Sequence, residues 1–242
     1  MNNDVKKCAI NLCLFSKGRD AMQDNFALLL LESPWWTPEA NPTRASALPF
    51  FQGLERLYDY FNIYYSTFHD TQGFEAALSL DLSHTREKRQ ILYIGAHGSE
   101  RSIANGRAST ILEKVALHGD RIEGVIISSC LVGARDSNLW APMLVNQTRW
   151  VFAYRRSVSW LTSQLLELAI LEELIFAPES YADDREALLE LFARALNRFN
   201  PSSLVGENGE PLSDCICLMQ RAKYKRFPEN ITDELIKLAW HD

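Results

Sequence analysis

Short apolar runs alternate with helical patterns through the first two thirds of the chain. Five runs have strand length and are rich in β-branched or aromatic residues: 8–15, 63–68, 91–96, 125–129 and 150–154. Helical spacing of apolar residues lies between them at 51–61, 74–80 and 111–117. Strands that are apolar on both faces and alternate with helices predict an α/β fold, with a mostly parallel sheet covered by helices on both faces.

The last third of the chain predicts longer helices. One is expected at 163–176, with Thr162 or Ser163 as its cap, and another at 183–199, which begins with acidic residues and ends with arginines. The second helix carries an apolar stripe that we interpret as core. A final strand at 214–219 and a terminal helix at 232–240 complete the pattern.

One segment interrupts the regular alternation. Residues 33–49 read SPWWTPEANPTRASALP, with four prolines, and predict a long loop. It is either a surface excursion pinned by Trp35 and Trp36 or a regulatory or substrate-side loop, since long loops in compact domains are often functional. Nothing else divides the chain, so we expect one domain over 1–242, with this loop inserted and a C-terminal appendage from about residue 204.

Composition narrows the class of protein. The 242 residues are 47% hydrophobic, which suffices for one sizeable core, and the net charge of -6 argues against sequence-independent nucleic-acid binding. Five cysteines at irregular spacing form no disulfide framework and fit a reducing compartment. The N-terminus shows no signal-peptide cleavage site, and the apolar run at 26–31 is too short to span a bilayer. We expect a cytoplasmic protein without nucleic-acid or membrane partners.

Two strand ends carry chemically reactive residues. ILYIGAHGSE places His97-Gly98 after one strand, and GVIISSCLVG places Cys130 after the next. The carboxyl ends of parallel strands gather at one edge of a sheet, and the helix at 111–117 suits the crossover between neighbouring strands. A cysteine thiolate attacks a carbonyl while a nearby imidazole moves protons. Either residue alone is typical of a buried cysteine or a turn histidine; together they predict a cysteine-nucleophile site.

Other chemistries lack their signatures. The sequence contains no Gly-x-Ser-x-Gly elbow and no dinucleotide fingerprint. Cys215-x-Cys217 has the wrong spacing for a zinc knuckle, so we expect no metal and no cofactor. A flavodoxin-like ligand-binding domain would share the parallel sheet, but its phosphate loop is not evident: Ser16-Lys17-Gly18 is too short a signal.

The His-Gly and Ser-Cys strand ends resemble those of the caspase-like cysteine peptidases, which include caspases, legumains, gingipains and separases. A third block, residues 150–174, is similar to the strand-loop-helix after the catalytic cysteine in small bacterial CHAT-like proteins. The resemblance covers about residues 50–176. It implies a caspase-like three-layer sandwich and a cysteine endopeptidase that cleaves protein or peptide substrates. It permits a role as an effector in bacterial stress or antiviral defence. Because an uncontrolled peptidase would be harmful in the cell, we also expect the loop at 33–49 or an activating or regulatory protein partner to govern access to the site.

The resemblance implies roles by position. Cys130 would be the nucleophile, His97 the general acid, and the backbone N–H groups of Gly98 and Cys130 the oxyanion hole. The stretch 154–160 would form a wall of the cleft and pair with an extended peptide. The residues assigned to substrate binding are Tyr154, Ser159, Trp160 and Asp136.

One departure bears on specificity. Relatives that cut after Arg or Lys place an aspartate where this chain has Ser159, which puts basic specificity in doubt. Asp136 and Glu100 lie beyond the catalytic strand ends and could bring a carboxylate to the pocket; without one, a neutral or polar residue would be preferred. Arg155 and Arg156 could instead meet an acidic side chain. The rival to peptidase function is a catalytically inactive caspase-like adaptor or binding module.

Overall fold

The chain's apolar strands form the centre of a mostly parallel sheet. The structure is a computed structural model and describes residues 26–34, 46–145 and 147–240. In these ranges seven strands pair in the order β2-β1-β3-β6-β7-β8-β9, and the first five are parallel. The strands are β1 (Phe26–Glu32), β2 (Phe61–Thr67), β3 (Arg89–Gly95), β6 (Ile122–Ser128), β7 (Trp150–Tyr154), β8 (Ile216–Gln220) and β9 (Glu229–Asn230).

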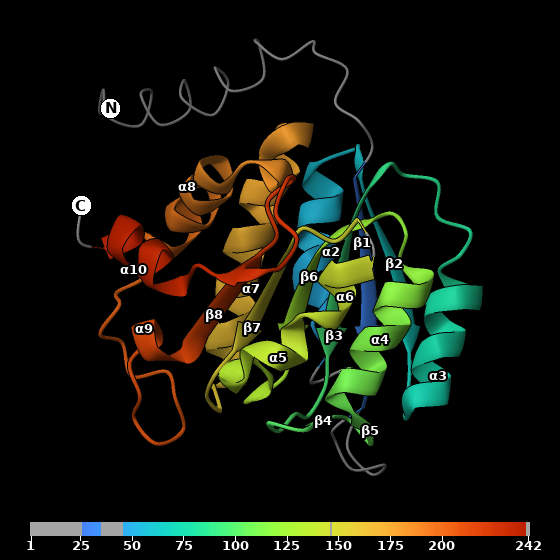
Figure 1. Ribbon diagram of the computed structural model, residues 1–242, viewed down its shortest axis with the longest axis horizontal. Helices are drawn as coiled ribbons and strands as arrows, with labels where there is room; N and C mark the ends of the chain where they lie inside the picture. The colour runs from blue at the N-terminus through green and yellow to red at the C-terminus, as the bar shows by residue number, and fades with distance from the viewer. Residues whose placement is uncertain (1–25, 35–45, 146, 241–242) are drawn as a thin grey trace, which may run out of the picture.

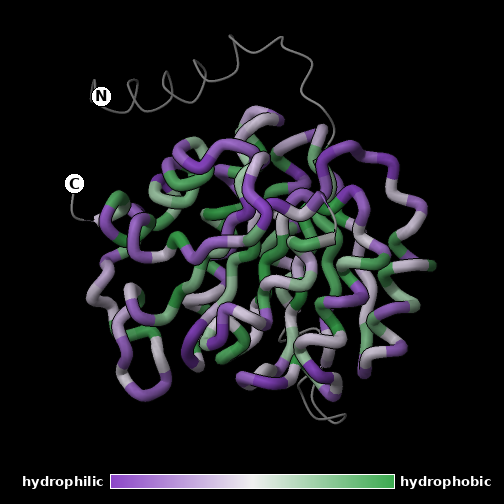
Figure 2. Tube along the Cα trace, viewed as in Figure 1, coloured by the Kyte–Doolittle hydropathy of each residue, from purple (hydrophilic) through white to green (hydrophobic). Residues whose placement is uncertain are grey.

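Helices cover both faces of this sheet (Figure 1). Alternate strand residues feed two cores: Leu28 and Leu30 of β1 face one layer, while Leu29 and Leu31 face the other. Figure 2 shows the strands between the helices as the most hydrophobic part of the chain. The first layer is α2 (Leu48–Leu57), α7 (Trp160–Ile175), α8 (Arg185–Leu196) and α10 (Thr232–Trp240). The second is α3 (Thr71–Ala76), α4 (Ala108–His118), α5 (Asp136–Leu139) and α6 (Ala141–Val145).

Shorter elements connect the layers. A two-stranded ribbon follows β3 directly, and one turn of 3-10 helix follows β6. Both therefore lie at the carboxyl ends of parallel strands. The remaining elements are η2 (Ala77–Asp81), β4 (Ser102–Ile103), β5 (Gly106–Arg107), η3 (Val132–Ala134), η4 (Glu179–Asp183) and α9 (Leu212–Cys215).

The predicted α/β class and the central strands are confirmed. β7 has the predicted bounds, while β2, β3 and β6 each begin two or three residues before the prediction. The predicted strand at 8–15 lies outside the described residues. The sequence analysis did not predict β1, because it interpreted residues 26–31 only as an apolar run too short to span a bilayer. These residues form β1, which lies between β2 and β3 in the sheet and is hydrogen-bonded to both.

Two predicted boundaries around α2 are wrong. The helix begins at Leu48, inside the predicted loop 33–49, because Pro49 sits in its first turn, where a missing N–H costs nothing. It ends at Leu57 because Tyr58 adopts an extended backbone, and Phe61 already belongs to β2. Residues 35–45 of the loop lie outside the described residues.

The predicted caps of α7 are also wrong. The helix begins at Trp160, so Ser159 occupies the cap position and makes no side-chain cap bond. The hydroxyl of Ser163 instead donates to the carbonyl of Trp160. In α8 the cap is Asp184, whose carboxylate accepts from the backbone N–H groups of two following residues. The predicted strand at 214–219 begins only at Ile216, because α9 precedes it.

The segment from residue 204 is part of the main core and not an appendage. β8 pairs antiparallel with β7 over its full length. Leu218, Ile231 and Leu235 are fully buried in the same core as α7 and α8.

Arg89 joins β3 to the end of α7, and its loss is expected to be costly. Its guanidinium donates to the carbonyls of Leu174 and Ala177 and pairs with Glu123 at 3.2 Å, with only 6% of the side chain exposed. Arg89→Met leaves Glu123, whose side chain is only 16% exposed, without its cation, so we expect a loss of about 3 kcal/mol or more in urea unfolding.

The matched control for this prediction is Arg194→Met. Arg194 also pairs with a glutamate, Glu173, but its side chain is 56% exposed. Such a pair contributes about 0–1 kcal/mol. Equal losses in the two variants would contradict the assignment of Arg89 as the buried link.

Candidate active site

His97 and Cys130 leave neighbouring strands at the same edge of the sheet. β3 and β6 pair in parallel, with Gly95 opposite Ser128, and the N–H of Ala96 donates to the Ser128 carbonyl at 3.2 Å. Each candidate residue therefore lies two positions beyond a matched pair. The predicted adjacency of the two strands is confirmed.

Gly98 brings the two strand ends into contact. A Cβ added at this residue would lie 2.6 Å from the carbonyl oxygen of Cys130, 2.8 Å from Cβ of Ser129 and 3.0 Å from the Cys130 nitrogen. Within the described ranges, neither Gly98 nor Cys130 uses its backbone N–H in a hydrogen bond. Two unused N–H groups close together are the arrangement that an oxyanion hole requires.

A sharp turn follows Cys130. Leu131 has φ of 65°, in the left-handed region that residues other than glycine rarely adopt, and it immediately precedes the short helix η3. Gly133 then packs against the Tyr154 carbonyl, with 3.0 Å between that oxygen and an added Cβ. The strained turn ends the strand abruptly, and it leaves Cys130 at the edge of the sheet with its side chain partly exposed.

A pocket of about 300 Å³ opens at these strand ends. The carboxyl ends of β1, β3, β6 and β7 supply its walls, together with the first turns of α7. His97, Gly98 and Cys130 all line it, so one space reaches both candidate catalytic residues. The lining segments are 32–33, 93, 95–98, 128–130, 154, 157–160, 163–164 and 207.

A hairpin at residues 204–211 supports one wall of this pocket. The N–H of Ser159 donates to Val205, and the N–H of Glu207 donates to Ser157. Backbone groups alternate in direction along an extended segment, so those of Val158 face away from the hairpin. They make no hydrogen bond within the described residues. The predicted pairing with an extended peptide can therefore use only the N–H and C=O of Val158.

The predicted substrate-binding residues divide into two groups. Tyr154, Ser159 and Trp160 line the pocket. Asp136 does not: it lies at the start of α5, exposed to solvent, and accepts a hydrogen bond from Asn230. Glu100 also lies outside the lining and pairs with Arg135. The two acids that sequence reasoning weighed for the pocket are thus engaged elsewhere.

Several polar residues at the pocket were missed. Glu32 ends the apolar run of β1, which is the same signal that identified His97 and Cys130. Gln164 and Glu167 are spaced i, i+3 in α7, so they share a face, and both are buried. Polar residues on a buried helix need hydrogen-bond partners, so this pair of residues in the sequence already indicated a buried polar cluster.

Glu167 is buried directly beneath the pocket. It is 0% exposed, and its Oε2 accepts from the Tyr93 hydroxyl at 2.8 Å and from Gln164 Nε2 at 3.0 Å. Burial raises the pKa of this carboxyl to about 7, while the hydroxyls of Ser128, Tyr93 and Tyr154 oppose the rise. Burial also raises the pKa of Glu32, against hydrogen bonds from Ser46 and Ala47.

Glu167 should make stability depend on pH. Its pKa is higher in the folded than in the unfolded chain, so its stabilising contribution is complete below about pH 4.5 and is lost as pH rises through about 7. The difference in free energy of unfolding between wild type and Glu167→Gln should fall by on the order of 2 kcal/mol between pH 5 and 8. Glu123 is present in both proteins and cancels, so the difference reports Glu167 together with its coupling to Glu32. Parallel stability curves from urea unfolding at each pH would contradict this account.

The described residues contain neither a cluster of metal ligands nor a membrane-spanning helix. No three His, Cys, Asp or Glu side chains there are grouped to hold a metal ion. No helix among them combines the length and apolar character needed to cross a bilayer.

Comparison with known proteins reveals a shared fold. No protein-family model and no curated protein sequence matches the chain. A secreted C11 cysteine protease of Bacteroides thetaiotaomicron, solved with an irreversible peptide inhibitor, is 10% identical, with a TM-score of 0.51 over 86% of this chain and 67% of that one. Another structure of a secreted C11 protease from that organism, named iotapain, is 10% identical, with a TM-score of 0.53 over 81% and 67%. The chain therefore has the fold of the C11 cysteine proteases, which belongs to the caspase-like type.

Proposed function

We propose that this protein is a cysteine endopeptidase in which Cys130 and His97 act as a dyad. The observation that carries the proposal is their position: both follow adjacent parallel strands and both line one pocket. A fold shared with C11 proteases supports it. The setting predicted from the sequence, bacterial defence or stress response inside the cell, stays a prediction.

The proposed reaction uses the groups already described. The Cys130 sulfur attacks the peptide carbonyl, and the resulting oxyanion accepts from the N–H groups of Gly98 and Cys130. His97 gives a proton to the leaving amine as the C–N bond breaks. Water then attacks the thioester, the acid product leaves, and the thiol is restored.

The substrate would bind in an extended conformation. The N–H and C=O of Val158 offer one edge for a peptide strand, because the hairpin occupies the other. Trp160 lines the pocket beside this edge and stacks edge-on against Phe50 of α2 at 5.4 Å. That packing holds the wall in place, so the binding surface is largely formed before substrate arrives.

A peptidyl electrophile tests the proposal against the inactive-adaptor alternative. Peptidyl acyloxymethyl ketones label a cysteine only where a proteolytic site activates and positions it. We expect labelling of Cys130, detected by mass spectrometry, and none of the buried Cys215 or Cys217. Failure of a peptide-electrophile library to label Cys130 in folded protein would favour the adaptor.

A further inference from the structure

The loop between β8 and β9 concentrates positive charge in an otherwise acidic protein. Four of the six residues at 221–226 are lysine or arginine and none is acidic, whereas the whole chain carries a net charge of -6. Gln220 pairs with Trp150, the first residue of β7, so the loop lies at the amino ends of the parallel strands. Figure 1 shows it at the edge of the sheet away from β4 and β5. The loop therefore lies opposite the edge that carries His97 and Cys130.

Nearby carboxylates do not balance this charge. The Lys223 ammonium lies 3.4 Å from Asp183, but the guanidinium of Arg149 is closer to the same carboxylate, at 2.8 Å. The Lys225 ammonium lies 3.4 Å from Glu229, which an arginine of α8 contacts more closely, at 2.6 Å. Each carboxylate is thus shared between two cations, so the loop keeps an excess of positive charge.

The two arginines of the loop show the same excess. Burial and the positive charge of Arg149 lower the pKa of the Arg221 guanidinium. Within the described ranges no carboxylate forms an ion pair with Arg226, whose guanidinium lies over the ring of Phe227 at 5.2 Å. An anion placed beside these groups would gain favourable charge interactions that the chain does not supply itself.

Exposed aromatic rings accompany the cations. Tyr224, in the middle of the loop, is 92% exposed. Phe227 and Trp140, which follows α5, are also exposed, and their ring centroids lie 6.4 Å apart. Tyrosine, tryptophan and arginine are the residues that most often dominate binding at protein interfaces. The basic-aromatic surface defined by these side chains consists of Trp140, Lys223, Tyr224, Lys225, Arg226 and Phe227.

We propose that the basic-aromatic surface docks an acidic segment of a partner protein. Carboxylates of the segment would complement the cations that the chain leaves in excess, and an apolar side chain of the segment would cover the exposed rings. Complementary charge speeds association and selects the partner. Because the surface and the pocket lie at opposite edges of the sheet, a docked partner leaves the pocket open.

A single-stranded nucleic acid fits this surface less well. Its bases need open ring faces on which to stack. The guanidinium of Arg226 already occupies one face of the Phe227 ring, and Trp140 lies beside that ring. The net charge of -6 also opposes the approach of a phosphate backbone. An acidic peptide needs only side-chain contacts and carries fewer charges past the rest of the protein.

Fluorescence anisotropy with two labelled peptides tests the proposal. In the first peptide, glutamates and aspartates flank one phenylalanine and one leucine; in the second, every acid is replaced by its amide. Wild type should bind the acidic peptide at least about tenfold more tightly than the amide peptide at low salt. Raising the salt from about 50 mM to about 500 mM should weaken the acidic peptide by about tenfold, because exposed charges are screened.

Two triple variants with the same net charge locate the binding. Lys223→Gln/Lys225→Gln/Arg226→Gln should weaken the acidic peptide by about tenfold or more. The matched control should bind it within about twofold of wild type. This control removes three exposed cations outside the surface, by Arg56→Gln, Arg86→Gln and Lys237→Gln.

Tyr224→Ala tests the aromatic part of the surface and should weaken the acidic peptide by about fivefold or more. Cys130→Ala should bind it as wild type does, so loss of peptidase function leaves the docking result unaffected. Equal affinities for the two peptides, or equal affinities of the two triple variants, would overturn the proposal. Tighter binding of oligothymidylate than of the acidic peptide would reject it, as would a wild-type dimer in sedimentation that the surface variant abolishes.

Discussion

Replacing Cys130 by alanine is expected to reduce peptide hydrolysis by at least about 1,000-fold, because no other group in the pocket can form the thioester. His97→Ala should cause a loss of similar size. If the two act as a unit, the double variant should be no worse than the worse single variant. Stopped assays of kcat/KM on purified proteins, with circular dichroism to verify folding, provide the measurement.

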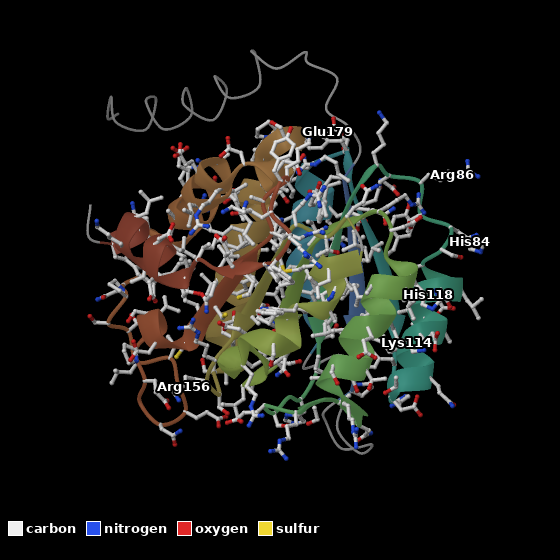
Figure 3. The ribbon with its side chains drawn as sticks, viewed as in Figure 1. His84, Arg86, Lys114, His118, Arg156 and Glu179 are labelled. Atoms are coloured by element: carbon white, nitrogen blue, oxygen red, sulfur yellow. The ribbon has the colours of Figure 1, made fainter. Side chains whose placement is uncertain are left out.

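Matched residues elsewhere serve as controls. Cys217→Ala removes a thiol that is buried in the sheet, and His118→Ala removes an imidazole that contacts Glu75 on the face of α4 toward α3 (Figure 3). Both should retain kcat/KM within about threefold. Wild-type kcat/KM in Cys130→Ala would contradict the assignment of the dyad. An equal loss of kcat/KM in the two control variants would contradict it as well.

Gly98→Ala should impair both activity and stability. The added methyl would lie 2.6 Å from the Cys130 carbonyl oxygen, and backbone atoms cannot move away as a flexible side chain would. The two strand ends must separate, so we expect a loss of at least about 100-fold in kcat/KM and about 1–3 kcal/mol in unfolding free energy.

Gly53→Ala is the control for the same chemical change. Nothing lies within 4 Å of a Cβ at this exposed position of α2. Alanine also favours helix, so a gain of up to about 1 kcal/mol with unchanged activity is expected. A Gly98→Ala protein that matched wild type in both measurements would mean that the strand ends tolerate separation.

The sequence predicted the parallel strands and the meeting of His97 and Cys130 at one edge of the sheet, for a physical reason. Strand ends in a parallel sheet converge, so a polar residue after an apolar run is informative even without distances. The same rule would have found Glu32, had the run before it been considered as a strand. Glu167 was harder to predict, because a carboxylate inside an apolar helix reveals its role only when the helix is placed against Tyr93 of β3.

Residues assigned by proximity in sequence were predicted less well. Asp136 lies only six positions after Cys130, yet the turn at Leu131 and helix η3 carry it out of the pocket. The hairpin that pairs with Ser157 and Ser159 comes from almost 50 residues further along the chain. Local patterns carry no information about such a long-range pairing.

That hairpin sets the order in which the site is completed during synthesis. A nascent chain that has emerged as far as residue 200 contains His97, Cys130 and their strands, but neither β8 nor the partners of Ser157 and Ser159. The backbone hydrogen bonds that brace Ser157 and Ser159 can form only after residues 205–207 leave the ribosome. The strand ends that carry the thiol and the imidazole are therefore synthesised well before the hairpin that braces the Ser157–Ser159 edge of the pocket.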